Sequence, residues 1–205
     1  MSKNILELRQ RQRSRARRKR RVKRLFAGIG IIIMSMLLCG SMISKCSAFS
    51  VTYTEMSVPS VNTSFKSYMD YRCVTSTSSP QYKFIHKWGW SDENGLMRCN
   101  GERELGINDD YYLAALGSYY GTAIGTKYRV TTDKGNVFYI ALADCKANRH
   151  TNSTNQYSTK NKDMIEFLVD THNLNKNVKK MGSCNVLAGL NGSIAKIEKM
   201  NFNYE

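Results

Sequence analysis

Three carboxylates stand next to strongly apolar runs, where acid–base chemistry is favoured. Asp144 directly follows the run Phe138–Ala143, and Glu166 and Asp170 flank the run Phe167–Val169. A carboxyl group at the edge of an apolar core is partly desolvated, which favours its neutral form and suits a general acid. We therefore expect Asp144 to act as a general acid or base, with Glu166 as its helper. Asp170 is a candidate binding residue on the same strand.

Aromatic side chains and one histidine are the other candidates for substrate binding. Tyr119 and Tyr120 precede Gly121, and Trp88 lies in the sequence HKWGW. Aromatic rings offer flat apolar faces on which a ligand can stack, although core packing is an equal alternative for all three. His150 lies in a polar loop, where it either assists proton transfer or simply meets solvent.

The elements that must position these residues are short strands. Turns rich in Gly, Asn and Asp separate them, and the pair 127–132 and 137–143 around Asp133-Lys134-Gly135-Asn136 is the clearest hairpin. This pattern predicts a mainly β domain of about six strands, with one short helix at 173–181. The predicted strands are 82–86, 111–116, 127–132, 137–143, 165–169 and 193–200.

The N-terminal third has a different composition. Residues 1–24 contain twelve Lys and Arg and one acid, so most of the net charge of +15 belongs to this tail. Residues 25–44 are uncharged, and as a helix they would extend about 30 Å, the thickness of the hydrocarbon core of a bilayer. Residues 45–81 are rich in Ser and Thr and predict an extended stalk before a domain at 82–205.

This arrangement predicts a single-pass membrane protein. The positive-inside rule places residues 1–24 in the cytoplasm and the C-terminal domain outside the cell. The basic tail is then expected to attract anionic lipid, and nucleic acid is not expected as a partner. A cleaved secretory signal, with a cleavage site near 46–48, is the alternative to a permanent anchor.

Cysteine content agrees with export, because Cys73, Cys99, Cys145 and Cys184 lie well beyond the apolar segment and disulfides form in oxidising compartments. We expect the pairs Cys73–Cys99 and Cys145–Cys184, with four reduced thiols as the alternative. No CxxC spacing occurs, and the three histidines are not spaced like zinc ligands beside the cysteines. Neither a metal nor a cofactor is expected.

The central segment resembles a known family. The order YYLAALGSYYGTAIGTKYRVTT, DKGN, VFYIALADCKA, a polar loop and MIEFLVDT is similar to the double-psi β-barrels of murein lytic transglycosylases and of 3D-domain cell-wall proteins of Gram-positive bacteria. The resemblance covers about residues 82–205 and implies a six-stranded double-psi β-barrel. In that family an Asp follows the hairpin's second strand, as Asp144 does here, and a second acidic strand follows, where this chain has Glu166.

The resemblance implies an enzyme that cleaves peptidoglycan glycan strands, with Asp144 as acid and base. The chain departs from the family where Cys145-Lys146-Ala147 follow Asp144 in place of a small pair such as Thr-Gly. If Lys146 pairs with Asp144 and keeps it ionised, the alternative is a non-catalytic module that binds cell-wall glycan or a partner protein.

Overall fold

The computed structural model describes residues 49–103 and 106–204. The predicted basic tail at 1–24 and the predicted span at 25–44 lie outside the described residues. Within the described ranges, no helix is both long and apolar enough to cross a membrane.

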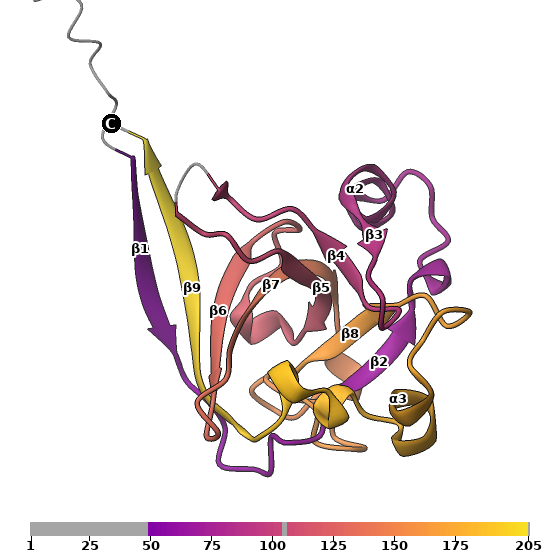
Figure 1. The fold of residues 1–205 in the computed structure, drawn as a ribbon. Helices are drawn as coiled ribbons and strands as arrows, with labels where there is room; N and C mark the ends of the chain where they lie inside the picture. Colours follow the sequence, from indigo (N-terminus) through magenta and orange to yellow (C-terminus); the bar gives the residue numbers. More distant parts are fainter. Residues whose placement is uncertain (1–48, 104–105, 205) are drawn as a thin grey trace, which may run out of the picture. The chain divides into compact units, whose positions relative to one another are not determined.

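Nine strands form one open sheet, so the prediction of a mainly β domain is confirmed, whereas the count of six strands was too low. The strand order is β1-β9-β6-β7-β5-β4-β3, and β8 pairs with both β5 and β2 (Figure 1). The strands are β1 Phe49–Met56, β2 Ser67–Asp70, β3 Trp90–Ser91, β4 Met97–Cys99, β5 Tyr111–Leu116, β6 Lys127–Thr132, β7 Val137–Cys145, β8 Glu166–Val169 and β9 Ile194–Tyr204.

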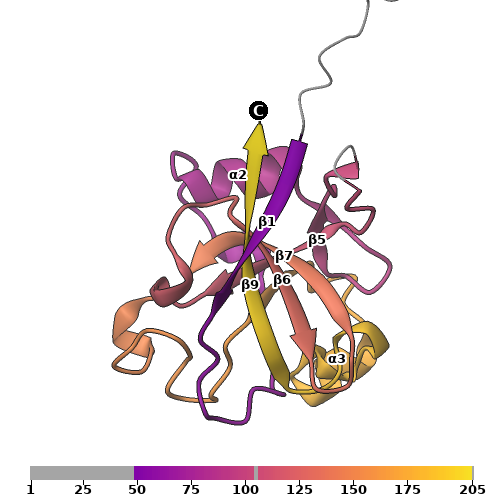
Figure 2. The ribbon, with the colours of Figure 1, turned by 90° about the vertical axis from the view of Figure 1, so that its left-hand side faces the viewer.

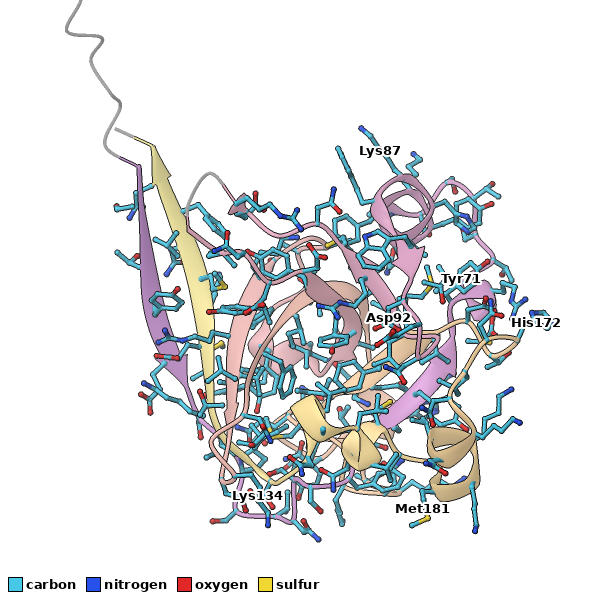
Figure 3. The ribbon with its side chains drawn as sticks, in the orientation of Figure 1. Tyr71, Lys87, Asp92, Lys134, His172 and Met181 are labelled. Atoms are coloured by element: carbon cyan, nitrogen blue, oxygen red, sulfur yellow. The ribbon has the colours of Figure 1, made fainter. Side chains whose placement is uncertain are left out.

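Two α-helices and several 3-10 turns complete the described fold. They are α2 Pro80–Trp88, α3 Lys176–Met181, and the 3-10 segments η1 Tyr71–Cys73, η3 Ser118–Tyr120, η4 Asn148–His150, η5 Cys184–Val186 and η6 Ala188–Leu190. The helix predicted at 173–181 is therefore present as α3. Its last residue, Met181, is 60% exposed and points outward (Figure 3).

The predicted hairpin is confirmed as β6 and β7. The two strands pair antiparallel from Lys127↔Ala141 to Thr131↔Val137. The turn has Gly135 at φ 80°, a left-handed conformation that glycine adopts without steric cost. The strands predicted at 111–116 and 127–132 coincide with β5 and β6.

The strand predicted at 82–86 was wrong, because these residues lie in helix α2. Ser79 caps the helix by accepting a hydrogen bond from the Tyr82 N–H, and Pro80 occupies its first turn. The run Tyr82–His86 is too short for its periodicity to distinguish a strand from a helix. The cap and the proline decide the conformation.

The stalk predicted at 45–81 was wrong from residue 49 onward. β1 pairs antiparallel with β9 over its whole length, and β2 pairs in parallel with β8. Beyond Lys199, β9 pairs only with β1, so the two strands run on together at one side of the sheet (Figures 1 and 2). Residues with a Ser/Thr-rich composition thus supply two strands of the fold.

The sheet has a hydrophobic cluster on each face. Phe138, Ile140 and Leu142 of β7 belong to the larger cluster, whereas Ala141 and Ala143 belong to the smaller one. Helix α2 covers the smaller cluster through Ile85, and α3 covers the larger one through Val178. Alternate residues of β7 therefore face opposite sides, as a strand buried on both faces requires.

The predicted disulfides are absent from the described structure. The four cysteines among the described residues are free: Cys73 is exposed, Cys145 is partly buried, and Cys99 and Cys184 are buried. Cys184 packs in the larger cluster and Cys99 in the smaller one, so both act as small apolar core residues.

Candidate functional site

A β-bulge near the end of β7 sets the direction of Asp144. Ala114 of β5 pairs with Leu142, but the next residue, Ala115, pairs with Asp144, so Ala143 is the extra residue. Without the bulge, Asp144 would continue the alternation on the face of Leu142 and the larger cluster. The bulge moves its side chain to the opposite face, shared with Ala115.

Glu166 reaches the same place from the other side of β5. The first residue of β8, Glu166, is also the register partner of Ala115. Neighbouring strands lie about 4.8 Å apart, so the Cα atoms of Asp144 and Glu166 are about 10 Å apart. Ala115, the register partner of both, separates the two acids in the sheet. The two predicted catalytic residues are therefore brought together.

The two carboxylates line one cleft of about 600 Å³, which we call the acid cleft. Its walls come from β5, the end of β7, the loop from residue 146 to residue 163, and β8. The lining residues are Ala115, Asp144, Cys145, Lys146, Ala147, Arg149, His150, Ser158, Thr159, Lys160, Asn161, Asp163 and Glu166.

Burial raises the pKa of Asp144 above its ordinary value. The Cys145 backbone N–H, the Gln81 side chain and the charge of Lys146 act in the opposite direction, but desolvation is the largest cause. No Lys, Arg or His nitrogen in the described part of the chain forms an ion pair with Asp144. The raised pKa is the property that a carboxylic acid needs to donate a proton.

Lys146 pairs with other acids of the cleft. Its Nζ lies 2.7 Å from Asp163 Oδ2 and 3.6 Å from Glu166 Oε2. The side chains of Lys146 and Asp163 are 6% and 1% exposed, whereas that of Glu166 is 29% exposed. The alternative in which Lys146 forms an ion pair with Asp144 is therefore not what the structure shows.

His150 lies in the acid cleft as an exposed residue of η4. Its Nε2 is 3.2 Å from Arg149 Nε, and its backbone oxygen accepts a hydrogen bond from the Thr159 N–H. The loop thus holds the imidazole at the rim of the cleft, where it can contact a ligand.

The two tyrosines are outside the lining of the acid cleft. Tyr119 is 42% exposed on η3. Tyr120 is 1% exposed, packs in the larger cluster, and donates its hydroxyl hydrogen bond to the Ser57 carbonyl at 3.0 Å. Tyr120 is a core residue and does not present a face to a ligand, because consecutive residues of a 3-10 turn point in different directions.

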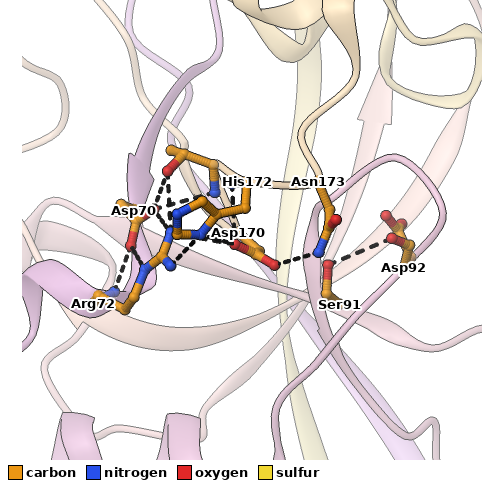
Figure 4. A network of polar contacts seen from close by, with 8 residues as sticks. Asp70, Arg72, Ser91, Asp92, Asp170, His172 and Asn173 are labelled. Carbon is orange, nitrogen blue, oxygen red and sulfur yellow. Dashed lines mark hydrogen bonds and ion pairs between the residues drawn. The ribbon is translucent and has the colours of Figure 1, made fainter.

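Trp88 and Asp170 also lie away from the acid cleft. Trp88, 56% exposed, lines a separate pocket of about 300 Å³ with Phe84 and Lys127 among its other walls. Asp170 accepts hydrogen bonds from Arg72 and from Asn173, at 3.2 and 2.6 Å (Figure 4). The sequence placed Asp170 correctly at the end of the strand that became β8. Its carboxylate, however, is hydrogen-bonded to Arg72 and Asn173 in a structural network.

Sequence reasoning missed Asp163. It precedes Glu166 by three residues, yet its burial depends on Ser67 of β2, whose hydroxyl donates a hydrogen bond to Asp163 Oδ2. Since β2 lies within the segment predicted to be a stalk, no local signal connects the two residues. Among the described residues no cluster of three or more His, Cys, Asp or Glu is placed to hold a metal ion.

Comparison of the chain with protein-family models, with curated protein sequences and with solved structures returned no match.

Proposed function

We propose that the acid cleft is a catalytic site that cleaves glycan strands of the cell wall, with Asp144 as general acid and base. The observation that carries the proposal is the placement of Asp144 and Glu166 on either side of Ala115 in one cleft, in unequal surroundings. Asp144 is desolvated and has a raised pKa, whereas Glu166 faces the Lys146 ammonium. Unequal environments of two carboxyl groups are how one site obtains an acid and a carboxylate at the same pH.

Cleavage of this kind requires no enzyme nucleophile. A water molecule or a hydroxyl of the substrate attacks the anomeric carbon. Asp144 protonates the glycosidic oxygen as its bond to the anomeric carbon breaks, and the Asp144 carboxylate then takes the proton of the attacking water or hydroxyl. Glu166 stabilises the positive charge that develops at the anomeric carbon. The resemblance to lytic transglycosylases and to a double-psi β-barrel is part of this proposal.

The test is release of soluble fragments from murein sacculi by the full chain in detergent. We expect the wild-type chain to release them and Asp144→Asn to lower the rate by about 10²- to 10⁴-fold, the usual contribution of a general acid. Glu93→Gln is the matched control, because Glu93 is exposed and lies outside the cleft lining. Full activity of Asp144→Asn would contradict the proposal.

A second candidate is binding of an anionic wall polymer without cleavage. Arg149 and Lys160 line the acid cleft, are exposed, and form no ion pair with an acid of the described chain. Cations of this kind attract a polyanion. Co-sedimentation with sacculi that depends on both residues, with no fragment release and no effect of Asp144→Asn, would favour this candidate over catalysis.

We also propose that residues 25–44 anchor the protein in the membrane and that the domain beginning at residue 49 lies outside the cell. The apolar length and the flanking basic tail support this topology. The protein is expected to remain in the pellet after alkaline carbonate extraction of cell membranes. Release of the intact chain into the supernatant would contradict the anchor, and appearance of a shortened chain outside the cells would indicate a cleaved signal.

A further inference from the structure

A buried ion pair between Lys146 and Asp163 forms part of the wall of the acid cleft. Lys146 Nζ and Asp163 Oδ2 are 2.7 Å apart, and their side chains are 6% and 1% exposed. Ser67 donates a hydrogen bond to the same carboxylate oxygen. The other oxygen, Asp163 Oδ1, is buried and has no hydrogen-bond partner among the described residues.

A buried ion pair is weak evidence of stabilisation. Removing two charges from water is costly, and replacing a buried ion pair with uncharged residues of similar volume is often neutral or stabilising. The unpartnered Asp163 Oδ1 adds a further desolvation penalty, since a buried acceptor without a donor is unfavourable. An incompletely paired buried acid in the wall of a cleft is therefore a candidate for a role in that cleft.

The geometry indicates that role. The Lys146 backbone N–H donates to the Leu116 carbonyl at 2.9 Å, which fixes this residue beside the end of β5. From there its ammonium lies between Asp163, which precedes β8, and Glu166, the first residue of β8. Lys146 thus connects the end of β7, which carries Asp144, to the start of β8, which carries Glu166.

We infer that Lys146, held in place by Asp163, is a positioning residue that orients Glu166 across Ala115 from Asp144. The inference rests on the proposed function for its catalytic consequence, but the orientation of Glu166 is a property of the folded chain. Asp163 also supplies the charge that balances Lys146. Asp163 takes up the ammonium at 2.7 Å, while Glu166 lies farther from it, at 3.6 Å, and faces the cleft. A carboxylate in that position favours a transition state with positive character over the sugar ring.

The experiment uses the full chain in detergent and the neutral pair Lys146→Met with Asp163→Asn. Asn keeps an acceptor for Ser67, and Met keeps most of the length of Lys, so the double variant preserves shape while removing both charges. We expect its urea midpoint to equal or exceed that of the wild type, and its rate of fragment release from sacculi to fall at least tenfold. Lys179→Met is the control, because Lys179 is exposed on α3 and has no ion pair in the described structure.

A second measurement is independent of catalysis and of the double variant. The ¹³C titration midpoint of the Asp144 carboxyl is expected to move upward in Lys146→Met and to stay unchanged in Lys179→Met, because the charge of Lys146 lowers the pKa of Asp144. A double variant that unfolds at much lower urea, together with an unchanged Asp144 titration, would assign the pair a structural role and overturn the inference. If the wild type releases no fragments, the proposed function fails, and the titration and the urea midpoint still decide the inference.

Discussion

Two clusters of acids and bases in the described part of the chain, the network around Arg72 and the acid cleft, differ in how completely their carboxylates are hydrogen-bonded. In the network around Arg72, both carboxylate oxygens of Asp70 have donors: Arg72 Nε at 2.7 Å from one oxygen, and Arg72 Nη2 at 2.6 Å and the Thr171 N–H at 3.1 Å from the other (Figure 4). In the acid cleft, Asp163 has one oxygen without a partner and Asp144 forms no ion pair with a described residue.

The difference separates a structural clamp from a site for chemistry. The network joins the end of β2 to the residues that follow β8, and the carboxylates of Asp70 and Asp170 both accept hydrogen bonds within it. The acid cleft leaves a desolvated acid facing about 600 Å³ of space. Polar groups that are fully paired rigidify a fold, whereas groups left poised in a cavity mark places where function takes precedence over stability.

Lys66 should give the largest effect on stability, because it is a buried ammonium group whose three N–H donors all have acceptors. It is 0% exposed, and its Nζ donates to the Ser64 carbonyl, Asn185 Oδ1 and the Gly192 carbonyl at 3.3, 3.0 and 2.6 Å. Lys66→Met leaves these acceptors without a donor, so we expect the free energy of unfolding at pH 7 to fall by about 3 kcal/mol. Urea unfolding measures the loss.

The same variant has a pH signature. Burial lowers the pKa of Lys66 to about 8 from 10.5, against the opposing charges of Asp133 and Cys184. Between these values the unfolded chain binds more protons than the folded chain, so stability rises with pH. The stability difference between wild type and Lys66→Met should therefore widen from pH 8 toward pH 10, by about 3 kcal/mol over the full window. A constant difference would mean that Lys66 is not desolvated.

Replacing Asp70 is expected to affect stability less than replacing Lys66, and to leave the activity of the acid cleft unchanged. The hydrogen bond from Arg72, helped by Thr171, holds the pKa of Asp70 well below its usual range. Asp70→Asn should lower the free energy of unfolding at pH 7 by about 1 kcal/mol, the size of a partly exposed ion pair. Because the folded-state pKa is depressed, this contribution is present above pH 4 and is lost as the pH falls below it. If Asp70→Asn stays fully folded but releases fragments more slowly, the network around Arg72 is not purely structural.

The effect of Asp144 on the pH dependence of stability should be opposite in sign to that of Asp70. Its folded-state pKa is raised, so ionisation at neutral pH works against folding, and the wild type gains stability relative to Asp144→Asn as the pH falls toward 4. At pH 7 the variant is therefore expected to be as stable as the wild type or slightly more stable, while it loses activity. The paired urea titrations of Asp70→Asn and Asp144→Asn at pH 4 and pH 7 test both signs. Parallel pH responses would remove the distinction between the two clusters.

Much of the local structure could be predicted from the sequence, and the non-local parts could not. The strand at 111–116 follows from its aromatic and apolar residues, and the strand at 127–132 from alternating residues before a turn that contains Gly-Asn. The short run 82–86 misled, because its cap and its proline make it a helix. The position of Asp144 at a strand end was also readable. Its direction depends on a bulge that only the pairing of β5 with β7 reveals. The burial of Asp163 depends on β2, which pairs in parallel with β8 across about a hundred residues.

Trp88 tests whether exposure of an aromatic ring alone is a sign of function. It is 56% exposed, lies outside the acid cleft, and its ring is covered on one face by Lys87 Nζ at 4.6 Å. Trp88→Ala should change the free energy of unfolding by less than about 0.5 kcal/mol, as expected for a surface position. Release of fragments from sacculi and co-sedimentation with them should also stay at wild-type levels, because Trp88 is not among the residues that line the acid cleft. A loss of co-sedimentation with retained stability would move the glycan-binding surface to the pocket of Trp88, and the acid cleft would then need a different ligand.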